Sequence, residues 1–190
     1  MNIKNIVSID IEGNGASPAE IIEISVIKVR ENKIIKDKTW LIKPEKPVSK
    51  YVTDIHGIRN EDLIGKPFFS EIKDEILDYV RNSVLLSHNV SVEKNILNRY
   101  LPEWEPLGFI DTLTASKKIL PNTKSFSLTN LVKELEIENL FINKVNKKAH
   151  RAEYDAYAAL YLYFELLKIA KKKGIAFLGY EDNMVQKKLF

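Results

Sequence analysis

The chain opens on an alternating strand that two more strand-like segments follow. Within NIVSIDIEG, residues 5–13, apolar and polar side chains alternate one by one from Val7 to Glu12, which is the period of a half-buried strand. Residues 20–29 and 33–42 are rich in isoleucine and valine, with a turn expected at residues 31–33. Three strands joined by short connections predict an antiparallel β-meander, and this start strongly limits the folds that the chain can adopt.

The remainder of the chain alternates between helical and strand-like segments. Residues 43–69 hold three prolines and two glycines, so a long irregular connection is expected there. Ser70 and Ser91 are expected to cap the two helices that come next. The order of segments predicts an α/β fold with a mixed β-sheet, three antiparallel strands plus parallel strands, flanked by helices. Helices are expected over residues 70–82, 91–101, 112–119, 127–137 and 151–170, and short strands over 84–89 and 109–113.

The composition limits the class of protein and of site. A chain of 190 residues suits one domain with a real core, and we expect that domain to span residues 1–170 and a C-terminal tail to span 171–190. The chain has no cysteine, which excludes disulfides and thiolate metal ligands. No long apolar run and no signal-peptide pattern is present, so we expect a cytoplasmic protein without a membrane span. A net charge of +3 permits a polyanionic partner.

Asp10 and Glu12 lie two residues apart in the first strand, so both carboxylates point to the same face. Two like charges at this spacing repel each other and raise each other's pKa unless a cation lies between them. A solvated strand face would also explain a D-x-E pattern. The GNG turn that follows lets the backbone approach a ligand closely.

Asp155 begins a stripe of core-facing positions on the last helix. Positions 155, 159, 162 and 166 recur at helical spacing, and the last three are Ala159, Leu162 and Leu166. A carboxylate on that stripe points toward the core and needs a partner, because burial of an unpaired charge is costly. Its partner is either the free N–H groups of the first helical turn or a metal ion shared with the strand acids.

His150 and Glu93 are weaker candidates when each is taken alone. His150 precedes Asp155 by five residues, about 140° around a helix, so we place it in the preceding loop, exposed to solvent or near a reacting water. An imidazole there can act as a general base near neutral pH. Glu93 begins a helix after a buried strand, where α/β sheets present side chains to ligands, although glutamate is common in any first helical turn.

Several separate stretches of the chain carry a common pattern: SIDIEGNG, EIIEISVIKV, IHGIRNEDL, LLSHNVSVEKNIL, IDTL with SLTNLVKELEI, and HRAEYDA. All three histidines of the chain fall in these stretches. Taken together, they resemble the DEDDh (DnaQ-like, proofreading-type) 3′–5′ exonucleases of the ribonuclease H-like superfamily, over residues 5–168. The resemblance implies hydrolysis of phosphodiester bonds from a 3′ end, with release of nucleoside 5′-monophosphates.

The resemblance also implies a role for each motif residue. Asp10, Glu12 and Asp155 would bind one divalent cation, Mg²⁺ or Mn²⁺, and Glu93 would complete the shell of a second that Asp10 bridges. His150 would deprotonate the attacking water. The substrate would be single-stranded nucleic acid or a frayed 3′ end. The family includes enzymes that act on DNA and enzymes that act on RNA, and the C-terminal tail slightly favours DNA. Asn89 would position the substrate, and Asp111 matches a structural DT pair without a metal role.

Two positions depart from the family pattern. Glu93 stands where the family usually has an aspartate, and its extra methylene shifts the carboxylate by about one C–C bond, which Mg²⁺ geometry tolerates poorly. Gly13 and Asn14 stand where threonines commonly follow the first-motif glutamate, so the contact to the terminal nucleotide differs. The rival hypothesis is an accessory subunit of the same fold, weakened in catalysis, that binds nucleic acid or associates with a clamp or polymerase.

Basic residues and the C-terminal tail suggest two further contacts. Lys144, Lys147, Lys148 and Arg151 surround His150 and would form a basic rim for phosphates, or simply a solvated charged loop. Phe126 and Tyr154 are expected to pack in the core rather than to stack on bases. The terminal QKKLF resembles peptides that dock on a bacterial sliding clamp; otherwise these residues pack on their own domain or on a second copy. The contact residues would be Gln186, Leu189 and Phe190.

Overall fold

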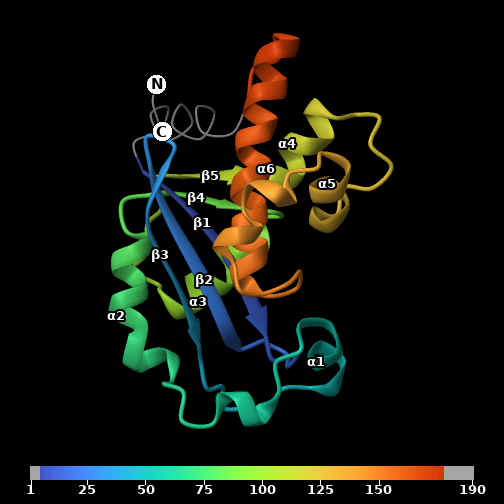
Figure 1. Ribbon diagram of the computed structural model, residues 1–190. Coiled ribbons are helices and arrows are strands. Elements are labelled where there is room, and N and C mark those ends of the chain that lie inside the picture. The colour runs from blue at the N-terminus through green and yellow to red at the C-terminus, as the bar shows by residue number, and fades with distance from the viewer. Residues whose placement is uncertain (1–4, 178–190) are drawn as a thin grey trace.

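A five-stranded mixed sheet forms the centre of the computed structural model, which describes residues 5–177 (Figure 1). The order is β3-β2-β1-β4-β5. β2 runs antiparallel to β1 and β3, whereas β1, β4 and β5 run parallel to one another, so the predicted sheet is confirmed. The strands are β1 (Ile6–Gly13), β2 (Ile21–Arg30), β3 (Lys33–Leu41), β4 (Val84–Ser87) and β5 (Gly108–Asp111). The QKKLF peptide, residues 186–190, lies outside the described residues.

Helices cover both faces of this sheet. The long helix α6 (Ala152–Lys173) packs with α4 (Thr112–Ile119) and α5 (Leu128–Glu134) on one face, as Figure 1 shows. On the other face lie α2 (Phe69–Val80) and α3 (Ser91–Tyr100). Two separate clusters of buried apolar side chains result, one under each helical layer. Ile175 and Phe177, which fall in the expected tail, pack against the cluster under α6.

The alternation of β1 assigns its side chains to the two layers. The odd-numbered Val7 and Ile9 are fully buried in the cluster shared with α2 and α3. The even-numbered side chains face α6, and the Ser8 hydroxyl donates to the Ala156 carbonyl over 2.8 Å. Asp10 and Glu12 follow on that same face. The strand therefore aims both carboxylates at the beginning of α6.

Residues 43–69 are more regular than the sequence predicted. They contain the helix α1 (Lys50–His56) and the 3₁₀ turn η1 (Asn60–Leu63). Two further 3₁₀ turns, η2 (Glu138–Leu140) and η3 (Ile142–Lys144), precede α6. Gly57 ends α1 in the left-handed conformation at φ 77°, which a glycine adopts without strain.

Two predicted helix caps were wrong. α2 begins one residue before Ser70, and the Glu71 carboxylate reaches back to accept from the Phe68 backbone N–H over 2.7 Å. Ser91 is the first residue of α3 itself, and its hydroxyl donates to the Asn89 side chain. Within residues 5–177, no helix is both long and apolar enough to cross a membrane.

Candidate active site

Three carboxylates meet where β1 ends and α6 begins. Asp10 and Glu12 come from β1 and Asp155 comes from the first turn of α6. One oxygen of each lies within 4.8 Å of the other two. The stripe on α6 is as predicted, since Ala159, Leu162 and Leu166 are buried against the sheet and turn Asp155 toward β1. Residues that are far apart in the sequence thus form one acidic cluster.

Burial and mutual repulsion make this cluster costly without a cation. Burial raises the pKa of Glu12 to about 8, and the charge of Asp155 adds to the shift. Burial also raises the pKa of Asp10 well above its usual value, with Asp155 as the next cause, and raises that of Asp155 to about 6. Carboxylate oxygens are the ligands that Mg²⁺ and Mn²⁺ prefer, and a divalent cation would offset the repulsion among them. The donor set therefore fits the predicted metal.

Glu93 lies close by but outside this cluster. It sits in the first turn of α3, is only 5% exposed, and has one carboxylate oxygen without a hydrogen-bond partner in the described structure. Burial raises its pKa to about 7, and its charge contributes to the raised pKa of Asp10. A buried carboxylate oxygen without a partner fits an additional ligand position, while its use in binding a second cation stays a prediction.

His150 lies in the loop before α6, as predicted. Its side chain is exposed, and its backbone adopts the left-handed conformation at φ 65°. The backbone N–H of His150 donates to the Asp155 carboxylate over 3.0 Å. The loop thereby holds the backbone against the acidic cluster and leaves the imidazole exposed.

Glu23, which was not among the residues expected in the site, lies beside the cluster. Glu23 on β2 is 1% exposed and pairs directly with Glu12 across the β1–β2 ladder. Its carboxylate accepts from the Arg151 guanidinium at 2.9 Å (Nε) and 2.5 Å (Nη2), and from the Ala152 backbone N–H at 2.9 Å. A glutamate inside the otherwise apolar run of β2 is the signal that could have revealed it.

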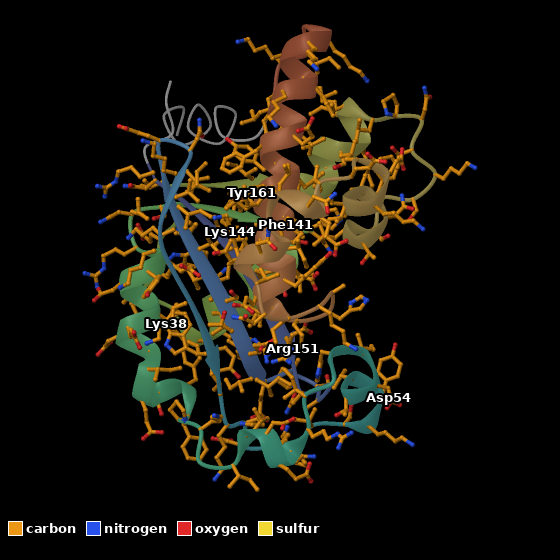
Figure 2. The ribbon with its side chains drawn as sticks, viewed as in Figure 1. Lys38, Asp54, Phe141, Lys144, Arg151 and Tyr161 are labelled. Carbon is orange, nitrogen blue, oxygen red and sulfur yellow. The ribbon has the colours of Figure 1, made fainter. Side chains whose placement is uncertain are left out.

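Arg151 therefore has a partner that the sequence did not suggest. It was expected in a phosphate-binding rim, but its side chain is only 16% exposed and its guanidinium donates two hydrogen bonds to the Glu23 carboxylate. Figure 2 shows Arg151 where the start of α6 meets the sheet. The hydrogen bonds from Arg151 to Glu23 raise the pKa of Arg151, and the charge of Arg151 moderates the raised pKa of Glu12.

Asn14 does not present its side chain to a substrate, so that expectation needs correction. Asn14 is fully buried; its amide donates to the Lys46 carbonyl over 3.1 Å and accepts from the backbone N–H groups of Ala16 and Glu20. It organises the loop after β1. Gly13 lies at a bulge in the β1–β2 ladder, where a Cβ would stand 3.3 Å from that of Ala19, tighter than an ordinary contact.

Asn89 and Asp111 form a linked pair at the ends of β4 and β5. Asn89 is exposed with φ 75°, and its backbone N–H donates to the Asp111 carboxylate over 2.9 Å. Asp111 also caps α4 by accepting from the Leu113 N–H over 3.0 Å. These bonds give Asp111 a structural role, as expected, and fix the backbone of Asn89 at the ends of the strands.

Residues 7–163 match the RNase_T exonuclease family. The chain belongs to this exonuclease family. A solved structure described as exonuclease X in complex with 5′ overhanging duplex DNA is 27% identical, with a TM-score of 0.68 over 93% of this chain and 98% of that chain. The ribonuclease H-like fold that the sequence predicted is thereby confirmed.

The curated relatives that this chain matches are much longer proteins. A PolC-type DNA polymerase III of Thermotoga petrophila is 30% identical over 185 residues, which cover 94% of this chain and 13% of the relative. A 3′–5′ exonuclease DinG of Staphylococcus epidermidis is 27% identical, over 94% of this chain and 20% of the relative. The chain therefore spans an eighth to a fifth of the length of these proteins. The nuclease domain of 3′hExo, a DEDDh family member bound to rAMP, shares the fold with a TM-score of 0.66 at 16% identity.

A groove of about 1260 Å³ runs beside the start of α6 in this exonuclease domain. Lys147 and Lys148, both exposed, line it together with Lys133 of α5 and the buried His56 of α1. Lys144 is exposed on η3 and does not line the groove. Two of the predicted rim lysines thus lie in a groove that Arg151 and Tyr154 also line, whereas none of the three clustered carboxylates lines it.

The two aromatic side chains that were expected to pack in the core do so. Tyr154 is 4% exposed, belongs to the core cluster under α6, and donates its hydroxyl to Glu138 over 2.6 Å. Phe126 is partly buried and packs against the same cluster. Burial therefore keeps the Tyr154 ring from stacking on a base.

Proposed function

We propose that this chain is a metal-dependent 3′–5′ exonuclease that removes nucleotides from a single-stranded or frayed 3′ end of DNA and releases nucleoside 5′-monophosphates. The observation that carries the proposal is the cluster of Asp10, Glu12 and Asp155, with one oxygen of each within 4.8 Å of the others, at the mouth of which His150 is exposed. We favour DNA over RNA as the substrate because exonuclease X, which is 27% identical, is described in complex with DNA.

Asp10, Glu12 and Asp155 would hold one divalent cation, and Asp10 with Glu93 would hold the second. Bound cations at such a site stabilise the charge on the attacking and leaving oxygens of the phosphodiester. The unpartnered, buried oxygen of Glu93 supports its role, although its side chain is one methylene longer than the aspartate of the DEDDh pattern.

His150 would take the proton from the attacking water. As that proton leaves, the water oxygen forms a bond to phosphorus and the P–O3′ bond breaks. The leaving 3′ oxygen takes a proton from solvent, so the shortened strand regains a 3′-hydroxyl, and the terminal nucleotide leaves with a 5′-phosphate. The exposed imidazole can approach the water while the backbone N–H stays bonded to Asp155. Lys147 and Lys148 would hold phosphates of the strand in the neighbouring groove.

A direct assay tests this function. Single-stranded DNA and RNA of the same sequence, labelled at either end, are incubated with the protein in Mg²⁺, Mn²⁺ or EDTA. We expect stepwise shortening from the 3′ end of DNA, dependent on the cation, with 5′-monophosphates identified by chromatography. An Asp10→Asn variant purified in parallel controls for contaminating nucleases. If no cation supports loss of the 3′ label, the proposal is wrong.

Glu93 favours the second candidate, an accessory module that binds nucleic acid with weakened catalysis. Its carboxylate lies outside the three-carboxylate cluster, and its position departs from the family pattern. The same preparation separates the two functions: retention of labelled single strands in a gel, without shortening in either cation, would favour the accessory module.

A further inference from the structure

Glu23 occupies a position that ordinary strand pairing disfavours. It lies directly opposite Glu12 in the antiparallel β1–β2 ladder, and like charges in such a pair repel. The Glu23 side chain is 1% exposed, so solvent does not screen that repulsion. A buried glutamate is tolerated only where other groups balance its charge and donate hydrogen bonds to its carboxylate.

All three hydrogen bonds of the Glu23 carboxylate go to the first residues of α6. Two come from the Arg151 guanidinium and one from the Ala152 backbone N–H. Arg151 is the N-cap residue of α6, and its own side chain does not cap the helix. A glutamate on the sheet thus supplies the cap from 128 or more residues away, where its negative charge also suits the helix N-terminus.

The anchored turn carries both α6-side members of the candidate site. The Asp155 backbone N–H donates to the Arg151 carbonyl over 3.0 Å, and the His150 backbone N–H donates to the Asp155 carboxylate over 3.0 Å. The other half of the acidic cluster, Asp10 and Glu12, lies on β1, the strand to which β2 is paired. Glu23 is therefore the link between the two halves.

We propose that Glu23 is a positioning residue that, through Arg151 and the Ala152 N–H, sets the placement of Asp155 and His150 relative to Asp10 and Glu12. This role rests on the proposed exonuclease function. Misplacement of catalytic groups by about 1 Å can cost on the order of 100-fold in rate. A purely structural ion pair would instead change stability alone, and an Arg151 reserved for substrate phosphate would change KM alone.

The test compares Glu23→Gln, Arg151→Lys and the double variant Glu23→Gln/Arg151→Lys with a variant of a surface ion pair. Glu75→Gln is the control, because Glu75 pairs with Lys38 at 2.5 Å and accepts from Trp40 at 3.0 Å on β3, away from the acidic cluster. Figure 2 shows Lys38 on the opposite side of the sheet from Arg151. Circular dichroism establishes folding, single-strand digestion gives kcat and KM, and calorimetric titration gives Mn²⁺ affinity without any nucleic acid.

We expect folded Glu23→Gln to lose about 10- to 100-fold in kcat, with KM within about twofold. Its Mn²⁺ affinity should fall about tenfold, which is the scale for a residue that orients a metal ligand. Arg151→Lys should show the same pattern to a smaller degree, because lysine keeps the charge but loses the fork. The double variant should lose less activity, on a free-energy scale, than the two single variants added together, since both residues act through one contact. Glu75→Gln should match wild type in all three quantities.

Wild-type kcat and Mn²⁺ affinity in folded Glu23→Gln would overturn the proposal, as would a change in KM alone. If Glu23→Gln does not fold, Arg151→Lys takes its place: wild-type kcat and Mn²⁺ affinity, or a change in KM alone, would then overturn the proposal. Failure of the exonuclease function is recognised separately, because the wild-type protein would then lack activity. The Mn²⁺ titrations of the folded variants would still show whether the Glu23 anchor shapes the acidic cluster.

Discussion

The backbone N–H of His150 and the carboxylate of Asp155 are joined by a hydrogen bond of 3.0 Å. Because the bond uses the main chain of His150, it fixes the loop beside the acidic cluster without occupying the imidazole. It also works against the burial that raises the pKa of Asp155. One contact therefore holds the carboxylate still and leaves its neighbour free to move, which suits a metal ligand beside a general base.

His150→Asn should lower kcat by about 10²- to 10⁴-fold, the usual contribution of a general base. Asparagine tolerates the left-handed backbone that His150 adopts at φ 65°, so the backbone bond to Asp155 should persist. Mn²⁺ affinity, measured by calorimetric titration, should stay within about threefold of wild type on that account.

His150→Gly serves as a second variant, because glycine also accepts this backbone conformation and carries no side chain at all. Both variants should show the same loss. A glycine variant with wild-type kcat would exclude the imidazole as the general base.

Glu12→Gln should raise the Tm of the metal-free protein at pH 8. The pKa of Glu12 is raised from 4.5 to about 8 in the folded protein, so folding favours its protonated form. The stability that this carboxyl contributes is complete below its unfolded pKa and is lost as pH rises to about 8. Glutamine mimics the protonated form at every pH.

The difference in Tm between Glu12→Gln and wild type, measured in EDTA, should therefore grow from near zero below pH 4.5 to its maximum above pH 8. Mn²⁺ at about 100 times its Kd should stabilise the wild type by about 2.7 kcal/mol and the variant by less. A difference that does not depend on pH would contradict the burial argument.

Local periodicity gave the direction of each acidic side chain, and the family resemblance assigned the three carboxylates to one site. The period-two pattern of β1 placed Asp10 and Glu12 on one face, and the helical stripe of α6 turned Asp155 toward the sheet. Both are properties of a single element. The Glu23–Arg151 contact joins residues 128 positions apart, and neither segment contains a sequence pattern that predicts this pairing.

The hydrogen-bond partners of polar side chains in loops and at helix ends were also not predictable from the sequence. Asn14 was assigned to the substrate from its place after Glu12, but its buried amide is fully used by the loop that it closes. Ser70 was taken as the cap of α2, whereas Glu71 reaches back to the Phe68 N–H one turn earlier. In both cases the hydrogen-bond partner of the side chain depends on the folded geometry of the backbone, which the local sequence pattern does not give.

Glu93→Asp should change the ratio of the rates in Mn²⁺ and Mg²⁺. The carboxylate is buried with one unpartnered oxygen, so its reach toward Asp10 is set by side-chain length rather than by solvent. Mg²⁺ demands near-ideal octahedral geometry, so the rate in Mg²⁺ should respond to the shorter side chain more than the rate in Mn²⁺. Rates in each cation at saturating substrate provide the measurement, and an unchanged ratio would show that Glu93 holds no catalytic cation.

Lys147→Ala/Lys148→Ala should raise KM and leave kcat within about twofold, because both lysines line the groove beside α6 and neither belongs to the acidic cluster. Each phosphate contact on a single strand contributes about 0.7 to the slope of log affinity against log salt concentration. The double variant should therefore show a slope shallower by about 1.4 if both lysines contact phosphates.

The matched control for this pair is Lys171→Ala/Lys172→Ala, which removes the same charge from the last turn of α6. That turn lies about 30 Å from the start of the helix, at a rise of 1.5 Å per residue. If binding depended only on net charge, the two double variants would lose affinity equally and with the same salt slope. A strand held in the groove predicts instead that the slope falls for Lys147→Ala/Lys148→Ala alone, and binding measured from 50 to 200 mM salt distinguishes the two.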